Sequence, residues 1–418
     1  MTVGDHPVVV IGAGPAGLAC AIELRRRRVS DILVLERESQ AGGIPRHSAH
    51  QGFGVRDLRR VMSGPRYARR YVEAARRAGA RLREEAMVTG WSADGALEVT
   101  SPEGREALVP AAVVLATGCR ERPRAARLVP GSRPQGVMTT GTLQQLVELH
   151  GQRIEGRVLV VGAEHVSFSA LLTLSRAGAR VIAMVTELPR HQSLGVVRLG
   201  ARLRYRTPLW TRTALTGIYG RHRVEEVEVL DLDSAATRRV PCNAVVFTAD
   251  WIPDHELAVL TGLDLDPATR GPRVDTGLRT NRAGVFAAGN LLQGAEPADV
   301  AALSGRHAAA SVAGWLTEPS AWPGPRVPIS CHPPLQWISP NAISPGSDAP
   351  PRGCFALRST VFLRAPLVEV RQDGRTLWRR RLPRLGPGRS TGLSAAWERA
   401  VDPSAGAVEV GLAEAAQT

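Results

Sequence analysis

Two groups of residues in this 418-residue chain have types and spacings that could do chemistry. The first is the glycine-rich run Gly12–Gly17, and the second is a loop that carries Arg46, His47 and His50. Glycines at this spacing let main-chain N–H groups approach a diphosphate, because a side chain would keep the backbone away. An imidazole takes up protons near neutral pH, and a guanidinium holds a carboxylate through two hydrogen bonds. The sequence therefore offers a phosphate site and a candidate proton-transfer site.

The residues around the glycines predict the βαβ unit that such a turn requires. Val8–Ile11 and Ile32–Leu35 are typical of buried strands, and Leu18–Arg27 between them has the apolar spacing of a helix. The start of that helix offers unpaired N–H groups and a positive dipole end to phosphates. Glu36 follows the second strand, 24 residues after Gly12, and is placed to accept hydrogen bonds from ribose hydroxyls. Together these elements predict a dinucleotide site.

Later stretches resemble, in the same order, the flavoproteins with two dinucleotide-binding domains, the glutathione reductase-like group. Gly42-Gly43 and the strand-ending run Ala116-Thr117-Gly118 resemble loops of its FAD sites. Thr280–Asn290 resembles its second flavin motif, with Asn where Asp is usual. Ala295–Ala309 resembles the helix whose N-terminus points at the flavin pyrimidine ring, where its dipole would stabilise reduced flavin. The resemblance covers residues 8–310 and implies bound FAD.

The resemblance implies an α/β fold with two Rossmann-like dinucleotide-binding domains, the second inserted in the first, as in the glutathione reductase-like FAD/NAD(P)-binding fold. It also implies which residues contact FAD. The predicted cofactor-binding residues are Gly12, Gly14, Pro15, Ala16, Gly17, Glu36, Arg37, Gly42, Gly43, Val88, Ala116, Thr117, Gly118, Gly289, Asn290 and Val300.

The chain is predicted to divide into four parts. Residues 1–150 and 275–318 are expected to form the FAD-binding domain, and residues 151–274 the second Rossmann-like domain. Ten of the 30 prolines lie within 319–353, which predicts an extended connector outside any core. Strand-like runs after it predict a small β-rich module over 354–418.

The second domain begins with a degraded copy of the first pattern, over Arg157–Glu187. Gly162 keeps the first glycine, whereas Glu164 and Ser167 take the positions of the second and third. A carboxylate there repels a diphosphate, and any side chain keeps the backbone away from it. Two interpretations remain open: a working NAD(P) site, and a scaffold that no longer binds dinucleotide. We favour the second, which requires a non-nicotinamide electron acceptor such as a quinone, a partner flavoprotein or oxygen.

The five cysteines do not form a C-x-x-C pair. Where the disulfide reductases carry the two cysteines after their Gly-Gly pair, this chain has Pro45 and His50. Thiol–disulfide exchange needs two thiols beside the flavin, so we do not expect a dithiol–disulfide reductase. The same scattered set predicts no metal or iron–sulfur site.

The loop Gly42–Gly54 resembles that of a narrower group of flavoproteins, the FAD subunits related to those of hydrogen cyanide synthase, opine oxidase and anaerobic glycerol-3-phosphate dehydrogenase. In this setting His50 occupies the slot nearest the flavin and is the predicted catalytic base, with His47 as the alternative. Arg46 is predicted to hold a substrate carboxylate. The other interpretation, that both histidines only bond to backbone, remains open.

These features predict an FAD-dependent oxidoreductase, a dehydrogenase or dehydrogenase subunit, that oxidises a small amine, imino acid or hydroxy acid. Its electrons would pass to a non-nicotinamide acceptor. A partner flavoprotein or a small iron–sulfur subunit is the expected protein partner. The alternatives are a non-catalytic flavin- or nucleotide-binding subunit that supports a partner dehydrogenase, and an NAD(P)H-dependent flavin reductase.

Composition narrows the remaining classes. The net charge is +14, every basic residue except histidine is arginine, and the charge is spread along the chain with only 4% aromatic residues. A nucleic-acid binder would concentrate that charge, so none is expected. No apolar run reaches the roughly 20 residues of a membrane span, and no basic stretch precedes the first apolar segment. We therefore expect a cytoplasmic protein.

Overall fold

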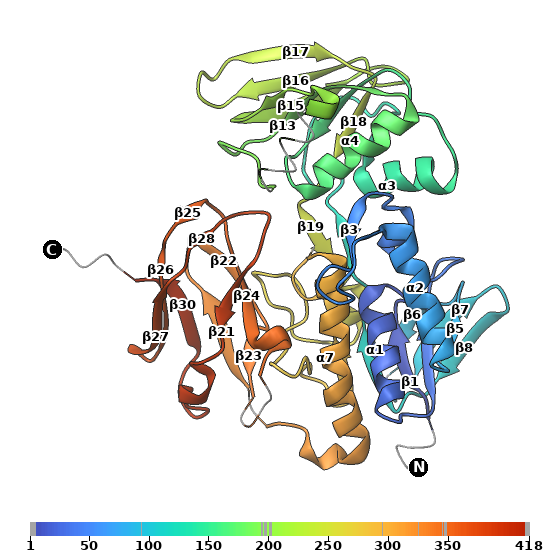
Figure 1. Cartoon of the computed structure of the whole chain (residues 1–418), viewed down its shortest axis with the longest axis vertical. Helices are drawn as coiled ribbons and strands as arrows, with labels where there is room; N and C mark the ends of the chain where they lie inside the picture. Colours follow the sequence, from blue (N-terminus) through green and yellow to red (C-terminus); the bar gives the residue numbers. More distant parts are fainter. Residues whose placement is uncertain are drawn as a thin grey trace.

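The computed structural model describes residues 6–92, 94–193, 195, 199, 203–294, 296–324, 326–344, 346 and 349–413. Three regions built around sheets make up the molecule (Figure 1). The first region holds both α1 and α7, the second lies above it in the view, and the C-terminal strands form the third beside α7.

The first region contains a parallel sheet of strand order β20-β9-β1-β2-β5. Its strands are β1 (Val8–Ile11), β2 (Ile32–Leu35), β5 (Arg81–Arg83), β9 (Ala112–Leu115) and β20 (Val285–Ala287). Strands β1, β2 and β9 are buried throughout, because helices cover the sheet and leave it little contact with solvent. The two predicted strands agree with β1 and β2 residue for residue.

Helices and small hairpins complete this region. Helix α1 (Pro15–Arg26) packs closely on α7 (Ala298–Thr317), because a Cβ on Gly305 would lie only 1.9 Å from the carbonyl oxygen of Ala16. Helix α2 (Gly64–Arg77) follows the hairpin of β3 (Gln51–Phe53) and β4 (Met62–Ser63). An antiparallel meander is formed by the strands β6 (Met87–Trp91), β7 (Leu97–Ser101) and β8 (Gly104–Leu108).

The second region repeats the parallel design with the order β11-β18-β12-β13-β14. Its elements are β11 (Val137–Thr139), α3 (Thr140–Gln144), β12 (Arg157–Val161), α4 (His165–Ala177), β13 (Arg180–Val185), β14 (Leu209–Trp210) and β18 (Ala244–Phe247). An antiparallel sheet of β15 (Thr213–Tyr219), β16 (Glu226–Asp231) and β17 (Thr237–Pro241) lies beside it. The paired strands β10 (Cys119–Glu121) and β19 (Trp251–Pro253) connect the two regions.

The predicted boundaries of the second domain are wrong at both ends. Strand β11 was assigned to the first domain, but it pairs with β18 in the second sheet. After β19 the chain returns to the first region through α6 (Glu256–Leu260), where Ala258 and Leu263 join the first hydrophobic core. The crossings therefore lie at β10 and β19, because sheet pairing over long sequence separations decides domain membership.

The predicted connector is also wrong, since residues 327–343 supply strands to the C-terminal module. Two of its sheets have the orders β23-β21-β30-β26-β27 and β22-β24-β29, and β25 pairs with β28. Their bounds are β21 (Val327–Cys331), β22 (Leu335–Ser339), β23 (Ala342–Ile343), β24 (Cys354–Ser359), β25 (Leu363–Arg364), β26 (Leu367–Gln372), β27 (Arg375–Arg381), β28 (Arg384–Leu385), β29 (Thr391–Ser394) and β30 (Val408–Leu412). Val327, Ile329 and Ile338 belong to its buried core.

Short 3-10 turns join several of these elements: Ile44–His47, Gly289–Leu291, Pro319–Ala321, Pro351–Gly353 and Glu398–Ala400, and a π-helical turn follows α3 over Gln145–Leu149. Among the described residues, the helices lack the combination of length and apolar character that a bilayer crossing requires.

The core position of the former connector predicts a stability effect. Ile329 is 3% exposed in β21, so Ile329→Ala should destabilise the protein by about 2–5 kcal/mol through lost burial and a residual cavity. The exposed Val361 offers a matched control, and Val361→Ala should stay within about 0.5 kcal/mol of wild type. Urea unfolding followed by tryptophan fluorescence measures both, and equal effects of the two variants would restore the connector interpretation.

Candidate functional site

The glycine turn after β1 combines two packing glycines with one open position. A Cβ on Gly12 would lie 2.5 Å from the Ala116 carbonyl oxygen, and one on Gly17 only 2.0 Å from the Gly12 carbonyl oxygen. A Cβ on Gly14 would meet nothing within 4 Å. Gly14 is also the N-cap of α1, and it provides no side-chain cap to the first N–H groups of the helix. These N–H groups are therefore available to an external anion.

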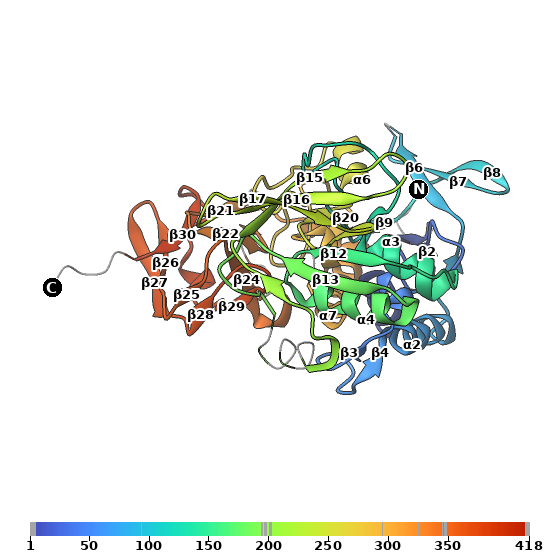
Figure 2. The ribbon, with the colours of Figure 1, turned by 90° about the horizontal axis from the view of Figure 1, so that it is seen from above.

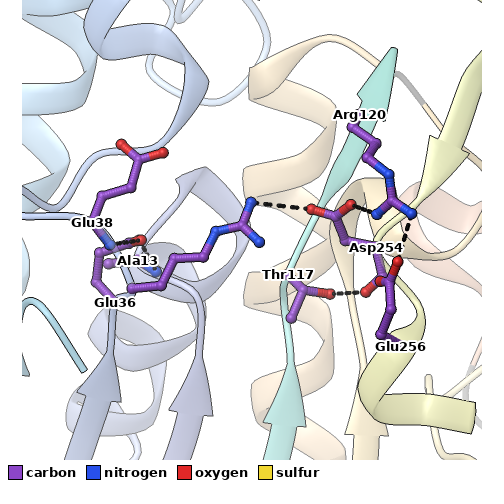
Figure 3. A network of polar contacts seen from close by, with 8 residues as sticks. Ala13, Glu36, Glu38, Thr117, Arg120, Asp254 and Glu256 are labelled. Carbon is purple, nitrogen blue, oxygen red and sulfur yellow. Dashed lines mark hydrogen bonds and ion pairs between the residues drawn. The ribbon is translucent and has the colours of Figure 1, made fainter. Parts of the chain in front are cut away.

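Glu36 lies at the end of β2, beside this turn. Its Oε2 accepts a hydrogen bond from the Ala13 N–H at 2.9 Å, and its Oε1 accepts one from the Glu38 N–H at 3.0 Å (Figure 3). Burial raises the pKa of the Glu36 carboxyl, and these two N–H groups oppose the shift. The carboxylate is thus fixed in orientation next to the glycine turn, as a ribose-binding acid requires.

Two more predicted cofactor segments converge on the same turn. The Gly42 N–H donates to the Ala13 carbonyl at 2.8 Å, and a Cβ on Gly43 would lie 2.9 Å from the Gly14 Cα. A Cβ on Gly289 would lie 2.6 Å from the Ala16 Cβ. The tertiary structure therefore brings together motifs that are separated by more than 270 residues in the sequence, as Gly12 and Gly289 show.

A polar network joins the predicted FAD-site loop Ala116-Thr117-Gly118 to the strands β10 and β19, which connect the two regions (Figure 3). Thr117 Oγ1 donates to the Asp254 carbonyl oxygen at 2.7 Å, while the Asp254 carboxylate pairs with Arg120 and with Arg37, the latter at 3.3 Å. Arg120 also pairs with Glu256. Two of the predicted cofactor residues, Arg37 and Thr117, thus contact the residue that follows β19.

The remaining predicted contacts lie in different surroundings. Asn290 closes its own loop, because its Nδ2 donates to the Glu296 carbonyl at 3.2 Å and its Oδ1 accepts from the Glu296 N–H at 3.1 Å. Val88 is buried in β6, and Val300 lies half-buried in the first turn of α7. Pro15 is the first residue of α1, and Gly118 immediately precedes β10. The Asn290 amide is therefore engaged within the chain rather than free.

The loop of residues 42–54, called the histidine loop below, places both predicted bases in partly desolvated positions. His47 is 1% exposed, and its Nδ1 is buried without a hydrogen-bond partner among the described residues. His50 Nδ1 lies 2.8 Å from the Gln51 carbonyl oxygen, and its ring centroid lies 4.9 Å from that of Phe53. Burial lowers the pKa of both imidazoles. Burial therefore favours the neutral form of both rings, which is the form that accepts a proton.

Arg46 does not have the free guanidinium that its predicted role requires. Its side chain is 11% exposed and forms an ion pair with Glu38. Neutralised in this way, it is not placed to hold a substrate carboxylate. The sequence shows both residues but gives no sign that the fold of the loop brings them together.

Sequence reasoning missed the residues that surround the loop. Arg56 donates from its main chain and guanidinium to Asp299, which is 1% exposed at the start of α7. Tyr67 and Tyr71 both donate to Asp57 Oδ2, each at 2.6 Å. The helical spacing of the two tyrosines, four residues apart in α2, was the available signal.

Comparison with known proteins identifies the family. Residues 6–305 match the model of the pyridine nucleotide-disulphide oxidoreductase family. The chain belongs to this family.

Individual relatives span two functional types. Over 300 residues the chain is 28% identical to thioredoxin reductase of Treponema pallidum (strain Nichols), covering 69% of this chain and 89% of that protein. It is 29% identical over 346 residues to an opine oxidase subunit of Agrobacterium tumefaciens (strain Ach5), covering 73% and 64%. It is 30% identical over 178 residues to hydrogen cyanide synthase subunit HcnB of Pseudomonas aeruginosa, covering 41% and 37%. The chain thus matches less than two thirds of the length of these two subunits.

Solved structures agree on the fold. Thioredoxin reductase of Lactococcus lactis superimposes with a TM-score of 0.62 at 19% identity, covering 75% of this chain and 99% of that one. The enzyme of T. acidophilum gives a TM-score of 0.61 at 21% identity, covering 73% and 97%. The protein is accordingly a flavoprotein oxidoreductase with the FAD/NAD(P)-binding Rossmann fold, as the sequence predicted.

In this family member the second nucleotide-type helix is closed by its own side chains. The N-cap of α4 is Glu164, whose N–H donates to Ser167 Oγ at 3.0 Å, while the Ser167 N–H donates to the main-chain carbonyl of Glu164 at 3.1 Å. Burial raises the pKa of Glu164, and Arg358 and a hydrogen bond from Trp251 oppose that shift. Donors that a diphosphate needs at this helix are therefore already used, and a carboxylate stands where the phosphates would lie.

The contrast between Gly14 and Glu164 predicts that a glutamate placed at position 14 impairs FAD binding. Gly14→Glu should lower FAD affinity by about 10²–10³-fold, because a carboxylate about 4 Å from a phosphate costs about 4 kcal/mol at an effective dielectric constant of 20. The control Gly314→Glu introduces the same side chain at an exposed, open position of α7. Flavin fluorescence titration of the apoprotein measures both, and full FAD affinity in Gly14→Glu would refute the site.

Proposed function

We propose that the protein is an FAD-dependent dehydrogenase, or the subunit of one, that oxidises a small amine, imino acid or hydroxy acid and passes electrons to a non-nicotinamide acceptor. The observation that carries the proposal is the difference between the two helix starts. The start of α1 is open at Gly14, whereas the start of α4 is capped by Glu164 and Ser167. On this proposal the first domain binds FAD and the second no longer binds NAD(P).

The cysteines support a reaction other than dithiol–disulfide exchange, although thioredoxin reductases are among the relatives. All five are free thiols, at positions 20, 119, 242, 331 and 354. Cys119 adjoins the predicted flavin loop, and burial raises its pKa, which disfavours the thiolate that exchange requires. The turn of α3 that contacts the histidine loop through Gln144 and Ser48 contains no cysteine.

The histidine loop supplies the groups for proton transfer. Bound FAD would accept a hydride equivalent, and the chain must then remove a proton from the substrate nitrogen or oxygen. His50 is the proposed base, because it is half-buried on a loop anchored to the glycine turn and burial lowers its pKa, which favours the neutral ring. His47 is the alternative base, and its buried Nδ1 has no partner among the described residues. The flanking Asp57–Tyr67–Tyr71 group holds the loop against α2.

The opine oxidase and hydrogen cyanide synthase relatives are both named as subunits. These names support the form of the proposal in which the protein is a dehydrogenase subunit that works with a partner flavoprotein or a small iron–sulfur protein. A non-catalytic role in such a complex remains the main alternative, and an NAD(P)H-dependent flavin reductase is the third. A cytoplasmic location stays a prediction.

An anaerobic reduction assay tests the proposal. The holoprotein is mixed with NADH, NADPH, and a panel of amino and hydroxy acids, and bleaching of the flavin absorbance is recorded. We expect bleaching by an acid of the panel and none by the nicotinamides within the same time. Fast reduction by NADH or NADPH would contradict the closed second site. If the second site is closed as proposed, the variant Glu164→Gly/Ser167→Gly should gain measurable NADH binding, because it frees the N–H groups at the start of α4.

If His50 is the base, its replacement should slow flavin reduction, and the rate should depend on pH in a defined way. His50→Ala should slow flavin reduction by about 10²-fold, the contribution of a positioned general base. Burial lowers the pKa of His50, and a protonated ring cannot act as the base. The fall of kcat/KM on the acid side should therefore occur at a pH below 6.5, the ordinary pKa of an imidazole. His222→Ala, at an exposed position, serves as control. Stopped-flow rates across pH 5–8 that are identical in His50→Ala and wild type would transfer the role to His47.

A further inference from the structure

A groove on the second domain gathers arginines along the edge of its parallel sheet, where β13 and β14 are neighbours. It encloses about 1040 Å³, and its walls come from β12, β13, β14, α4 and β17. Figure 2 looks down on this region and shows β13 between α4 and the sheet of β15–β17. We call it the arginine groove, after the residues Arg157, Arg180, Arg204, Arg206, Arg238 and Arg239, which line it.

The charge in the arginine groove is of one sign. Among the described residues, those that line the groove include no aspartate or glutamate. Arg239 forms an ion pair with Glu226, which lies outside the lining. The other five guanidiniums are exposed and form no ion pair within the part of the chain that the structure describes. An external anion can therefore bind them without displacing a carboxylate of the chain.

Two of these arginines lie over aromatic rings. The Arg238 guanidinium carbon lies 3.9 Å from the Trp210 ring centroid, and that of Arg204 lies 5.6 Å from the Tyr205 ring centroid. Such a contact holds a guanidinium through its face, while its N–H donors lie in the plane of the group. The donors thus remain free to bind an anion, and less side-chain freedom is lost when an anion binds.

The arginine groove is separate from the capped start of α4. Arg157 and Arg180 begin β12 and β13, whereas Glu164 follows the other end of β12. A strand rises about 3.3 Å per residue, so the stretch from Arg157 to Gly162 spans roughly 16 Å. Glu164 is not among the residues that line the groove. The carboxylate that repels a phosphate at α4 therefore does not act against an anion in the groove.

The number and spread of the unpaired arginines favour a ligand with several phosphates. One carboxylate or phosphate occupies one or two guanidiniums, whereas these five come from four separate segments of the chain. The enclosed volume lies at the upper end of the roughly 300–1,000 Å³ that is typical of small-molecule sites. A nucleic-acid strand fits less well, because both aromatic rings are half-buried and already face an arginine, which leaves little ring surface for stacking of bases.

We propose that the arginine groove binds a small ligand with three or more linked phosphates, either a nucleoside triphosphate or a short inorganic polyphosphate. The unpaired guanidiniums hold the phosphate oxygens through paired N–H donors. The two sources share this chemistry and differ in whether a nucleoside is attached. Because neither glycine turn lines most of this edge and Glu164 lies at the opposite end of β12, the site is distinct from both dinucleotide-type turns.

Isothermal calorimetry of the FAD-loaded protein in magnesium-free buffer tests this proposal, because bound FAD keeps the probes out of the first domain. Tripolyphosphate and ATP should bind with an affinity that falls as salt is added. Citrate should bind roughly 10-fold more weakly than tripolyphosphate at the same ionic strength, because it carries fewer charges. Tighter binding of ATP than of tripolyphosphate would assign the site to a nucleotide, and the reverse order would assign it to inorganic polyphosphate.

The double variant Arg180→Ala/Arg206→Ala removes two of the unpaired guanidiniums and should raise the tripolyphosphate Kd by roughly 10²-fold, as expected for lost hydrogen bonds to a charged group. Arg221→Ala/Arg223→Ala is the matched control, because it removes two exposed arginines of the same domain that do not line the groove. Its tripolyphosphate Kd should stay close to that of wild type, and both variants should keep their FAD content.

Three results would overturn the proposal: no binding of tripolyphosphate or ATP by the wild-type protein, equal affinities for tripolyphosphate and citrate, or equal losses of affinity in the two double variants. Tighter binding of an oligothymidylate than of tripolyphosphate would also overturn it, and would make the arginine groove a nucleic-acid site. None of these results depends on which substrate reduces the flavin, so the proposed function is tested separately.

Discussion

The main-chain N–H groups at the start of a helix can bind an external anion only where the chain does not already supply their acceptors. This constraint separates the two nucleotide-type helices of the molecule. At α1 the N-cap is Gly14, so the donors face open space beside Glu36. At α4 the N-cap is Glu164, which with Ser167 uses two of those donors internally. Two domains with the same parallel-sheet design thus differ in what they can bind. On the proposed function, this difference is the reason why electrons leave the flavin for an acceptor other than NAD(P).

The rest of the site is arranged around the open turn. Gly43 and Gly289 approach the start of α1 so closely that side chains there would collide with it. This packing carries the histidine loop over the turn and buries His47. Desolvation lowers the pKa of His47 and so favours its neutral form, since a charged ring loses more hydration on burial than a neutral one. The C-terminal module also contributes a charge to this region: Arg358 forms an ion pair with Glu296 and interacts electrostatically with Glu164.

Prediction from sequence succeeded where a pattern is local. Strands β1 and β2 were predicted residue for residue, because a β-branched run between a turn and a helix has few alternatives. It failed for the supposed connector, where proline content outweighed the alternation of Val327 and Ile329 that places both in the core. Pro328 lies between them in an edge region of the sheet, pairing with Ala342 of the two-residue strand β23. Proline is tolerated at such positions, so its frequency alone does not exclude strands.

By itself the sequence determined the nucleotide chemistry. A glycine either permits a close approach of backbone or, when replaced as at Glu164, prevents it, and this can be read from residue identity alone. Only the tertiary structure decided which charges remain available. It neutralises Arg46 with Glu38 and pairs Arg37 with Asp254, more than 200 residues away in the chain. Charge pairing depends on distance in space, and packing of separate domains sets that distance, so no local pattern in the sequence contains it.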